Sequence, residues 1–571
     1  MLAHTQPPGW VFCESHPISM TAISDIKPKT TNSSGKSWAG WAAWLLVLVA
    51  GGLQAFSLAW PWARGHGDGW LTLTGGYGRP LWWLQILSLA VLVYALLAAS
   101  TPRQAAGKAW VFGTGWLAAT FWWLFISMHT YGGLAAPLAV AAVLALAAFL
   151  GSYYAIVSWC FKRLVKVPDW QLAIVFAALW TLAELARGWL WTGFPWGAGG
   201  YAHVEGPLAV LPRWIGVYGT GFVAAWLAAW LALLVRGHQT QARQNFKPVL
   251  LSVAALVLIW GGLWWSRGQS LAAETTQPGL SVEMLQGNIP QDEKFEMGSG
   301  VIVALRWYAQ QLHESTAQLV VAPETAIPLL PQQLPEDYLD FVRSRFVGKD
   351  AKQAALVGIP LGNLDAGYTN TVEGWVPGQT KPYQYDKHHL VPFGEFIPPM
   401  FRWFTDLMNI PLGDFNRGAL GQPSMNWAGE RLSPNICYED LFGEELAAHF
   451  GNAATAPTVL VNLSNIGWFG NSIAIDQHLN ISRMRALEFE RPMLRATNTG
   501  ATVVIDHTGA VTQALVPFER AVLQGKVQGR DGLTPYARWV HMLGLVPLTV
   551  LCVALLALIS WRSRKAHNEY R

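Results

Sequence analysis

The sequence predicts a polytopic α-helical membrane domain joined to a water-exposed, layered α/β domain. Only 13% of the 571 residues are charged, whereas soluble domains carry about 25%. The apolar residues are concentrated in residues 38–265 and 539–561, and residues 278–530 have the mixed composition of a globular domain. The formal net charge of +4 is small and its basic residues lie between apolar segments, so nucleic acid is not an expected partner.

Eight segments are long and apolar enough to cross a lipid bilayer, which requires about 20 mostly apolar residues. Seven precede the α/β domain and one follows it: 38–58, 80–100, 109–128, 134–160, 168–190, 208–235, 247–265 and 539–561. The alternative, buried helices of a soluble bundle, would need polar faces that these segments lack. Residues 1–37 are polar and lack the pattern of a cleavable signal peptide. We expect them to form a disordered leader, for which Met1 and Met20 are equally acceptable starts.

Basic residues in alternate loops predict the orientation in the membrane, because such residues remain on the cytoplasmic side. The opposite loops hold little beyond Arg64, Arg79 and Arg213. Both termini, including the tail 562–571, are therefore predicted to be cytoplasmic and the α/β domain to face the periplasm of a bacterial inner membrane. The basic residues on the cytoplasmic side are Lys27, Lys29, Lys36, Arg103, Lys108, Lys162, Arg163, Lys166, Arg236, Arg243, Lys247, Arg562, Arg564 and Lys565.

One predicted span carries two ionisable residues. Glu184 and Arg187 are three residues apart and share a helical face. Charges at membrane depth are costly and often functional, but a self-neutralising pair near the helix end is an equally good interpretation. The Phe194-Pro195-Trp196 sequence that follows predicts an interfacial turn beside the functional site.

Short apolar and β-branched segments alternate with helical stretches in residues 278–530. This alternation is typical of layered α/β domains. The predicted helices include 301–314, 335–347 and 474–490, and the predicted strands are 280–286, 317–322, 354–359, 370–375, 383–387, 433–437, 457–463 and 500–506.

Three residues with reactive side chains fall just past or at the ends of predicted strands, where ligand sites of layered sheets form. They are Glu324 in AQLVVAPETAIP, Lys387 in YQYDKHHLVPFGEF and Cys437 in SPNICYED. Each alone has an ordinary interpretation, and a lone cysteine is favoured as a packed side chain by about two to one. Their joint occurrence in three apolar, turn-rich contexts indicates a site. The other cysteines, Cys13, Cys160 and Cys552, show neither metal nor disulfide spacing.

The order Glu, Lys, Cys and the strings PETAIP, YDKHHLVPFGEF and ICYED resemble the carbon–nitrogen hydrolase (nitrilase) superfamily. The predicted spans and the strings GWLWTGFPWG and LTPYARW narrow this resemblance further. The chain from about residue 38 resembles the apolipoprotein N-acyltransferase family. The resemblance implies a nitrilase-like αββα sandwich with Glu324 as general base, Lys387 as oxyanion stabiliser and Cys437 as nucleophile. It implies no metal or organic cofactor. The supporting residues of the expected site are Glu395, Tyr438, Glu439, Phe295 and Trp196.

The sequence departs from the family pattern at two positions. Phe295 follows Lys294 where the family often has Trp, and Ile466 replaces the acidic residue of an SNDAWFG motif. Phe295 keeps an aromatic face, so this change affects the expected lipid contact more than the chemistry. Ile466 excludes a catalytic role for an acid at that position.

The expected reaction follows from thiol chemistry. A thiol with an ordinary pKa near 8.5 is mostly protonated at neutral pH and requires a base or a nearby cation, here Glu324 and Lys387. The resemblance implies transfer of an acyl chain from a phospholipid, through a Cys437 thioester, to the N-terminal S-diacylglyceryl-cysteine of an apolipoprotein. The alternatives are a membrane-tethered nitrilase-type amidohydrolase and a non-enzymatic lipoprotein-binding or export protein.

A further apolar segment follows Glu395. Phe401, Phe404 and Met408 share a helical face there, which predicts an arm inserted into the membrane interface. A hydrophobic loop packed on the core of the domain is the alternative.

Overall fold

The computed structural model describes residues 33–62, 76–164, 169–239, 261–262, 265, 270–363, 365–398 and 415–569. It divides into two compact units, Met1–Leu45 and Leu46–Arg571. The described part of the first unit is the beginning of helix α1 (Ser33–Leu58). Most of the predicted leader, most of the predicted span 247–265 and the predicted arm lie outside the described residues.

Apolar helices make up most of the described residues before position 240. They are α1, α2 (Trp82–Leu97), α3 (Pro102–Phe121), α4 (Leu124–Ile126), α5 (Ala136–Leu164), α6 (Asp169–Trp189) and α7 (Pro212–Gln239). Together with a helix near the carboxyl terminus, five described helices are long and apolar enough to cross a bilayer. A sixth candidate is bent by 60° between Pro102–Phe121 and Leu124–Tyr131. Several apolar helices are thus confirmed, and the number of eight stays a prediction.

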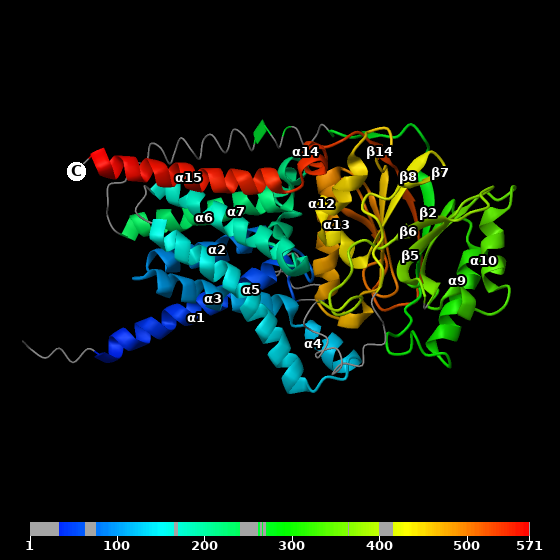
Figure 1. Ribbon diagram of the computed structural model, residues 1–571, viewed down its shortest axis with the longest axis horizontal. Coiled ribbons are helices and arrows are strands. Elements are labelled where there is room, and N and C mark those ends of the chain that lie inside the picture. The colour runs from blue at the N-terminus through cyan, green and yellow to red at the C-terminus, as the bar shows by residue number, and fades with distance from the viewer. Residues whose placement is uncertain are drawn as a thin grey trace, which may run out of the picture. The chain divides into compact units, whose positions relative to one another are not determined.

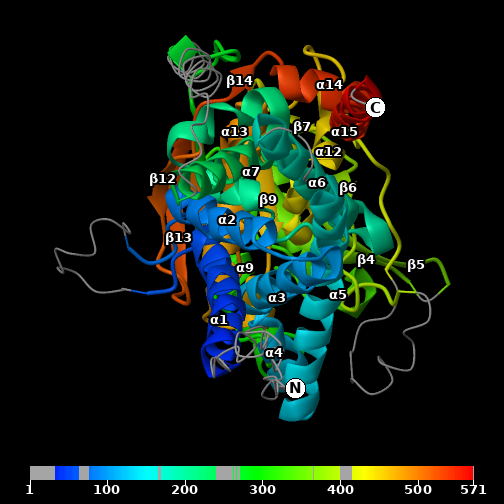
Figure 2. The same ribbon diagram turned by 90° about the vertical axis from the view of Figure 1, so that its left-hand side faces the viewer.

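Close packing of these helices depends on small residues and large aromatic side chains. Helices α3 and α5 approach each other at Gly113 and Gly151, where a Cβ atom on Gly113 would lie 3.1 Å from the Cα atom of Gly151. Small residues allow such contacts between helix backbones in a membrane. Trp116 and Trp180 stack with ring centroids 5.8 Å apart in the interior of this bundle. Figure 2 views the chain from the side on which these helices lie.

The segment predicted as the last span is two helices, α14 (Pro535–Leu543) and α15 (Val546–Glu569). They separate at Gly544, whose φ of +55° lies in the left-handed region that glycine tolerates. Helix α15 packs against α6, and α14 packs against α7 (Figure 1). Helix α7 is itself broken at Gly216 (φ +66°), where a Cβ atom would lie 2.2 Å from the Cε2 atom of Tyr536. Glycine is required there because it lets α14 approach α7.

Two six-stranded sheets form the α/β domain. The order in the first sheet is β13-β2-β3-β4-β5-β6, and β2, β3 and β4 are parallel. The order in the second is β12-β11-β10-β9-β8-β7, and β8, β9 and β10 are parallel. The first sheet contains β2 (Leu280–Gln286), β3 (Leu319–Ala322), β4 (Ala354–Asn363), β5 (Gly367–Trp375), β6 (Tyr383–Asp386) and β13 (Ala521–Val527). The second contains β7 (Met425–Trp427), β8 (Glu430–Ile436), β9 (Val459–Ser464), β10 (Met493–Thr497), β11 (Val503–Ile505) and β12 (Val511–Ala514).

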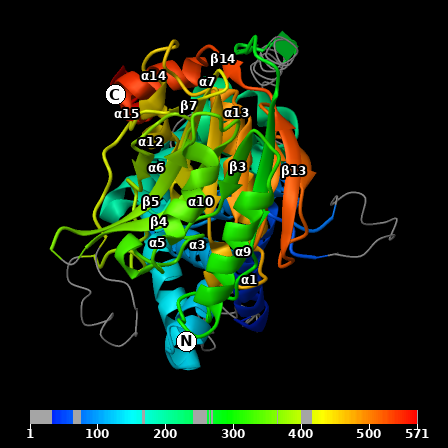
Figure 3. The same cartoon turned by 90° about the vertical axis from the view of Figure 1, so that its right-hand side faces the viewer.

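Alternation along the strands divides the interior into layers. In β3, Val321 packs with Val461 of the second sheet, whereas Val320 and Ala322 pack with the helices on the other face. Those helices are α9 (Gly300–Glu314) and α10 (Tyr338–Val347), which cover the first sheet (Figures 1 and 3). Helix α13 (Ala474–Phe489) covers the second sheet. The expected αββα sandwich is therefore confirmed.

Candidate active site

The three predicted catalytic residues lie at the ends of three strands. Glu324 is two residues past β3, Lys387 directly follows β6, and Cys437 directly follows β8. Strands β3 and β6 belong to the first sheet and β8 to the second. The site therefore lies at one end of the sandwich and takes residues from both sheets.

Lys387 is held between two carboxylates. Its side chain is 1% exposed, and Nζ donates to Glu395 Oε1 at 2.8 Å and to Glu324 Oε1 at 3.3 Å. Asn370 Nδ2 donates to the same two oxygens, at 2.8 Å and 2.7 Å. Burial alone would lower the pKa of Lys387, but Glu395 and Glu324 outweigh it and raise the pKa above its ordinary value. Lys387 is therefore a fixed cation, and Glu395 is the second carboxylate that holds it.

The second oxygen of Glu324 and its backbone carbonyl are also bound. Asn465 N donates to Glu324 Oε2 at 2.9 Å, and Lys294 Nζ donates to the carbonyl oxygen at 3.1 Å. Burial lowers the pKa of Lys294 to about 7, although the negative charge of Glu324 opposes this shift. Lys294 was not among the predicted site residues and served only to locate Phe295. The signal that identifies it is its position in the IPQDEKF segment that follows β2.

Cys437 has a strained backbone and a half-buried side chain. Its φ is +51°, a conformation that costs a non-glycine residue about 1–3 kcal/mol and that clusters at active sites. Burial raises the pKa of the Cys437 thiol to about 12, with Glu324 adding to the increase and Lys387 opposing it. The expected favouring of the thiolate by Lys387 is therefore outweighed, because burial destabilises the anion more. The resting group is therefore a thiol.

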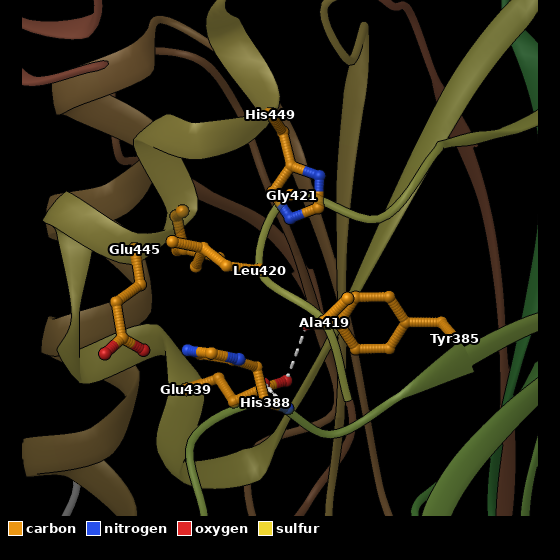
Figure 4. A pocket seen from close by; sticks show the side chains of 9 residues that line it. Tyr385, His388, Ala419, Leu420, Gly421, Glu439, Glu445 and His449 are labelled. Atoms are coloured by element: carbon orange, nitrogen blue, oxygen red, sulfur yellow. Dashed lines mark hydrogen bonds between the residues drawn. The ribbon is translucent and has the colours of Figure 1, made fainter. Parts of the chain in front are cut away.

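Glu439 binds the backbone on both sides of the site. Its Oε1 accepts from the N–H groups of His388 (2.7 Å) and His389 (3.2 Å). Its Oε2 accepts from the N–H of Ile436 (2.6 Å) and the hydroxyl of Tyr385 (3.0 Å). Glu439 also lines a small pocket with Tyr385 and His388 (Figure 4). Its role in the structure is to fix the segment after Lys387 against the segment before Cys437.

Tyr438 and Trp196 lie at contacts between the α/β domain and the loop after α6. The Tyr438 hydroxyl donates to the carbonyl of Gly193 at 3.3 Å. The Trp196 indole N–H donates to Gln477 Oε1 at 2.9 Å, and its ring lies 5.1 Å from that of His478. Neither residue is bonded to the Lys387 carboxylate pair among the described interactions.

The two positions that depart from the family pattern have different surroundings. Phe295 is half-buried, and its ring lies 6.0 Å from Lys294 Nζ. Ile466 is 1% exposed and belongs to the apolar core beside Gly500. Its side chain therefore packs and carries no polar role.

Glu184 and Arg187 hold the loop that contains Trp196. The Arg187 guanidinium donates to the carbonyls of Phe194 and Trp196, both at 2.7 Å, and to the hydroxyl of Tyr154 at 3.1 Å. Glu184 Oε1 accepts from the N–H of Gly199 at 2.8 Å. Glu184 and Arg187 therefore do more than neutralise each other's charge, because both side chains fix the loop from residue 194 to residue 199.

Comparison with known proteins covers both parts of the chain. A family described as Apolipoprotein N-acyltransferase N-terminal domain matches residues 68–230, and the Carbon-nitrogen hydrolase family matches residues 284–536. An apolipoprotein N-acyltransferase of Verminephrobacter eiseniae (strain EF01-2) is 56% identical over 525 residues, which are 88% of this chain and 94% of that protein. One of Ralstonia nicotianae (strain ATCC BAA-1114 / GMI1000) is 46% identical over 465 residues, 80% of this chain and 86% of that protein. The chain therefore belongs to the apolipoprotein N-acyltransferase family.

Proposed function

We propose that the chain transfers an acyl group from a phospholipid to the N-terminal S-diacylglyceryl-cysteine of apolipoproteins, through a thioester on Cys437. Family membership supports an acyltransferase with lipid and lipoprotein substrates. The observation that carries the assignment of residues is the buried Lys387, which contacts Glu324 and Glu395 and interacts electrostatically with Cys437. One cation, one base and one thiol are the groups that acyl transfer requires.

In the first half-reaction, the Cys437 sulfur attacks the ester carbonyl carbon of the phospholipid. Glu324 takes the thiol proton during the attack, because the thiol is protonated at rest. The carbonyl oxygen becomes an oxyanion that Lys387 stabilises. As the carbon–oxygen bond breaks, Glu324 returns the proton to the leaving alkoxide, and a lysophospholipid departs.

In the second half-reaction, the α-amine of the diacylglyceryl-cysteine attacks the thioester carbonyl carbon. Glu324 takes a proton from the amine and gives it to the departing Cys437 sulfur. Lys387 again stabilises the oxyanion. The product is an amide, and the enzyme is returned with its thiol.

The amidohydrolase alternative is not favoured. The matched family extends through residues 68–230 of the helical part, which a tethered amidase does not need. The binding-protein alternative does not explain a strained cysteine beside a buried Lys–Glu cluster. Five apolar helices support a membrane protein. Within this proposal, the enzyme lies in a bacterial inner membrane with the α/β domain in the periplasm.

The mechanism is tested by isolating the first half-reaction. Phospholipid alone should generate a thioester on Cys437 that neutral hydroxylamine removes and that intact-mass analysis detects. A diacylglyceryl peptide with a free amine should discharge it to an amide, and an N-acetylated peptide should not. Discharge by water as fast as by amine would instead indicate a hydrolase.

Variants assign the residues. Cys437→Ala should form neither thioester nor product, and Glu324→Gln and Lys387→Met should slow acylation by about 10²-fold or more. Glu445→Gln is the matched control, since this carboxylate pairs with His389 rather than with Lys387. N-acylated peptide made by the Cys437→Ala variant would exclude the covalent route.

A further inference from the structure

The carbonyl oxygen of Cys437 is held by two buried side chains. His478 Nε2 lies 3.2 Å from this oxygen, and Asn462 Nδ2 donates to it at 3.3 Å. His478 is 1% exposed and Asn462 is fully buried. Because the Cys437 backbone has a φ of +51°, its strained conformation persists only if surrounding groups fix it. These two contacts act directly on the peptide unit that carries the nucleophile.

The surrounding hydrogen bonds determine the protonation of His478. Arg495 Nη2 can only donate, and it lies 2.9 Å from His478 Nδ1. Nδ1 is therefore the acceptor, and the proton of the neutral ring is on Nε2. That N–H points at the Cys437 carbonyl and at Asp440 Oδ1, 2.8 Å away. Burial and Arg495 lower the pKa of His478, in agreement with a neutral ring.

Arg495 also fixes the second side chain. Its Nη1 donates to Asn462 Oδ1 at 2.9 Å and to Ser482 Oγ at 2.7 Å. One guanidinium thus orients both groups that bind the Cys437 carbonyl. The arrangement leaves no described member of this cluster in contact with the Glu324–Lys387–Glu395 group, so it lies behind the nucleophile and not around the reacting atoms.

His478 is in contact with the loop after α6 as well. The Trp196 ring lies 5.1 Å from the His478 ring, and its indole N–H binds the neighbouring Gln477. The indole N–H of Trp123 donates to the same Gln477 oxygen at 3.1 Å. Arg187 binds the carbonyl of Trp196. A continuous set of contacts therefore joins the helical part to the peptide unit of Cys437.

We propose that His478 is a positioning residue that fixes the Cys437 backbone through its Nε2–H and transmits the position of the Trp196 loop to the nucleophile. The proposal deepens the acyl transfer proposed above and rests on Cys437 as the nucleophile. His478 does not touch the substrate or exchange protons with it in this role.

The test measures the rate of thioester formation per titratable Cys437, with phospholipid as the acyl donor in detergent micelles. His478→Leu should lower the acylation rate at saturating phospholipid by about 10²-fold, because the sulfur is then misplaced, with the phospholipid concentration for half-maximal rate changed less than about twofold. His478→Gln, whose amide N–H reaches the same oxygen, should restore the rate to within about fivefold of the original protein. Dividing the rate by the number of titratable Cys437 thiols distinguishes a slower reaction from a smaller folded fraction of the protein.

Asn480 provides the matched control on the same helix. It is buried and donates to the carbonyls of Leu58 (3.0 Å) and Gly78 (3.2 Å), away from Cys437. Asn480→Leu should reduce the folded fraction and leave the rate per active site unchanged. Equal slowing by Asn480→Leu and His478→Leu, or a His478→Gln variant as slow as His478→Leu, would overturn the positioning role. If the original protein forms no thioester at all, the proposed function itself fails.

A double-mutant comparison tests the contact with Trp196. Trp196→Leu should lower the rate per active site, and combining it with His478→Leu should cause little further loss, because the effect passes through His478. If the two losses multiply, Trp196 acts independently and the transmission part of the proposal is wrong.

Discussion

Glu324, Glu395 and Lys387 interact electrostatically with the Cys437 thiol, and so does Lys294. The two lysines differ in how firmly they hold their protons. Lys387 is paired with Glu324 and Glu395 and stays protonated. Lys294 binds only a backbone carbonyl in the described structure, and burial lowers its pKa to about 7. Near neutral pH the site therefore gains or loses one positive charge through Lys294.

We predict that this charge appears in the pH dependence of acylation. As the pH rises through about 7, Lys294 loses its proton, and the rate of thioester formation should fall because an anionic transition state loses a cation. Lys294→Arg should remove this fall on the alkaline side, since arginine stays charged. Lys294→Met should be slower at low pH by about tenfold, which corresponds to ~1.4 kcal/mol. Superimposable profiles of the original protein and Lys294→Arg would contradict the assignment.

The positions of Glu324, Lys387 and Cys437 could be predicted because each residue follows a short apolar strand and carries a side chain that is unusual there. Asn370 and Lys294 could not be predicted in the same way. Asn370 lies within β5, where a polar residue in a strand is expected to face solvent. Its side chain instead bridges Glu324 and Glu395, and this contact depends on how β3 and β5 are placed on either side of β4.

At the scale of elements, most strands of the two sheets follow from β-branched and apolar runs, but β7, β10, β12 and β13 fall outside the predicted segments, and so do the short strands β1 (Ala273–Glu274) and β14 (Arg530–Asp531). Strand β10 shows one reason. Arg495 lies in the middle of β10, and a buried arginine interrupts the apolar run on which the prediction depends. Its partners, Asp440, Asn462 and His478, come from other elements. The break between α14 and α15 was also not predicted, because the sequence 539–561 is apolar through Gly544.

The break in α7 gives a prediction about stability. Gly216→Ala should lower the free energy of unfolding by more than about 2 kcal/mol, because alanine is strained at positive φ and its Cβ atom would overlap Tyr536. Gly52→Ala in α1 is the control, since a Cβ atom there meets no atom within 4 Å. That change should be neutral or stabilise by up to about 1 kcal/mol. Thermal unfolding in detergent, followed by tryptophan fluorescence, measures both. Equal melting temperatures would contradict the close contact between α7 and α14.

The predicted orientation of the whole molecule in the membrane is tested with single cysteines, each introduced into a protein whose natural cysteines are replaced. Ala366→Cys lies in the exposed turn between β4 and β5, and Ser563→Cys lies near the end of α15. The distribution of basic residues predicts that an impermeant maleimide labels the first in intact spheroplasts and the second only after permeabilisation. The opposite pattern would reverse the proposed topology.

The placement of α14 and α15 after the α/β domain has a consequence for biosynthesis. At about 5–20 residues per second, the ribosome needs on the order of half a minute to pass from the end of α6 to α15. In the apolar segment Trp170–Thr192, 78% of the residues are buried, whereas in Val546–Lys565 of α15 only 11% are buried. Helix α15 therefore lies at the periphery of the helical part. The central helices can therefore associate before translation ends. Contacts of α7 with the α/β domain, such as the Val217 N–H to Glu488 and Arg213 with Glu490, can form earlier. The contact that must wait is Tyr536 against Gly216, so α14 packs on α7 only as the last helices emerge.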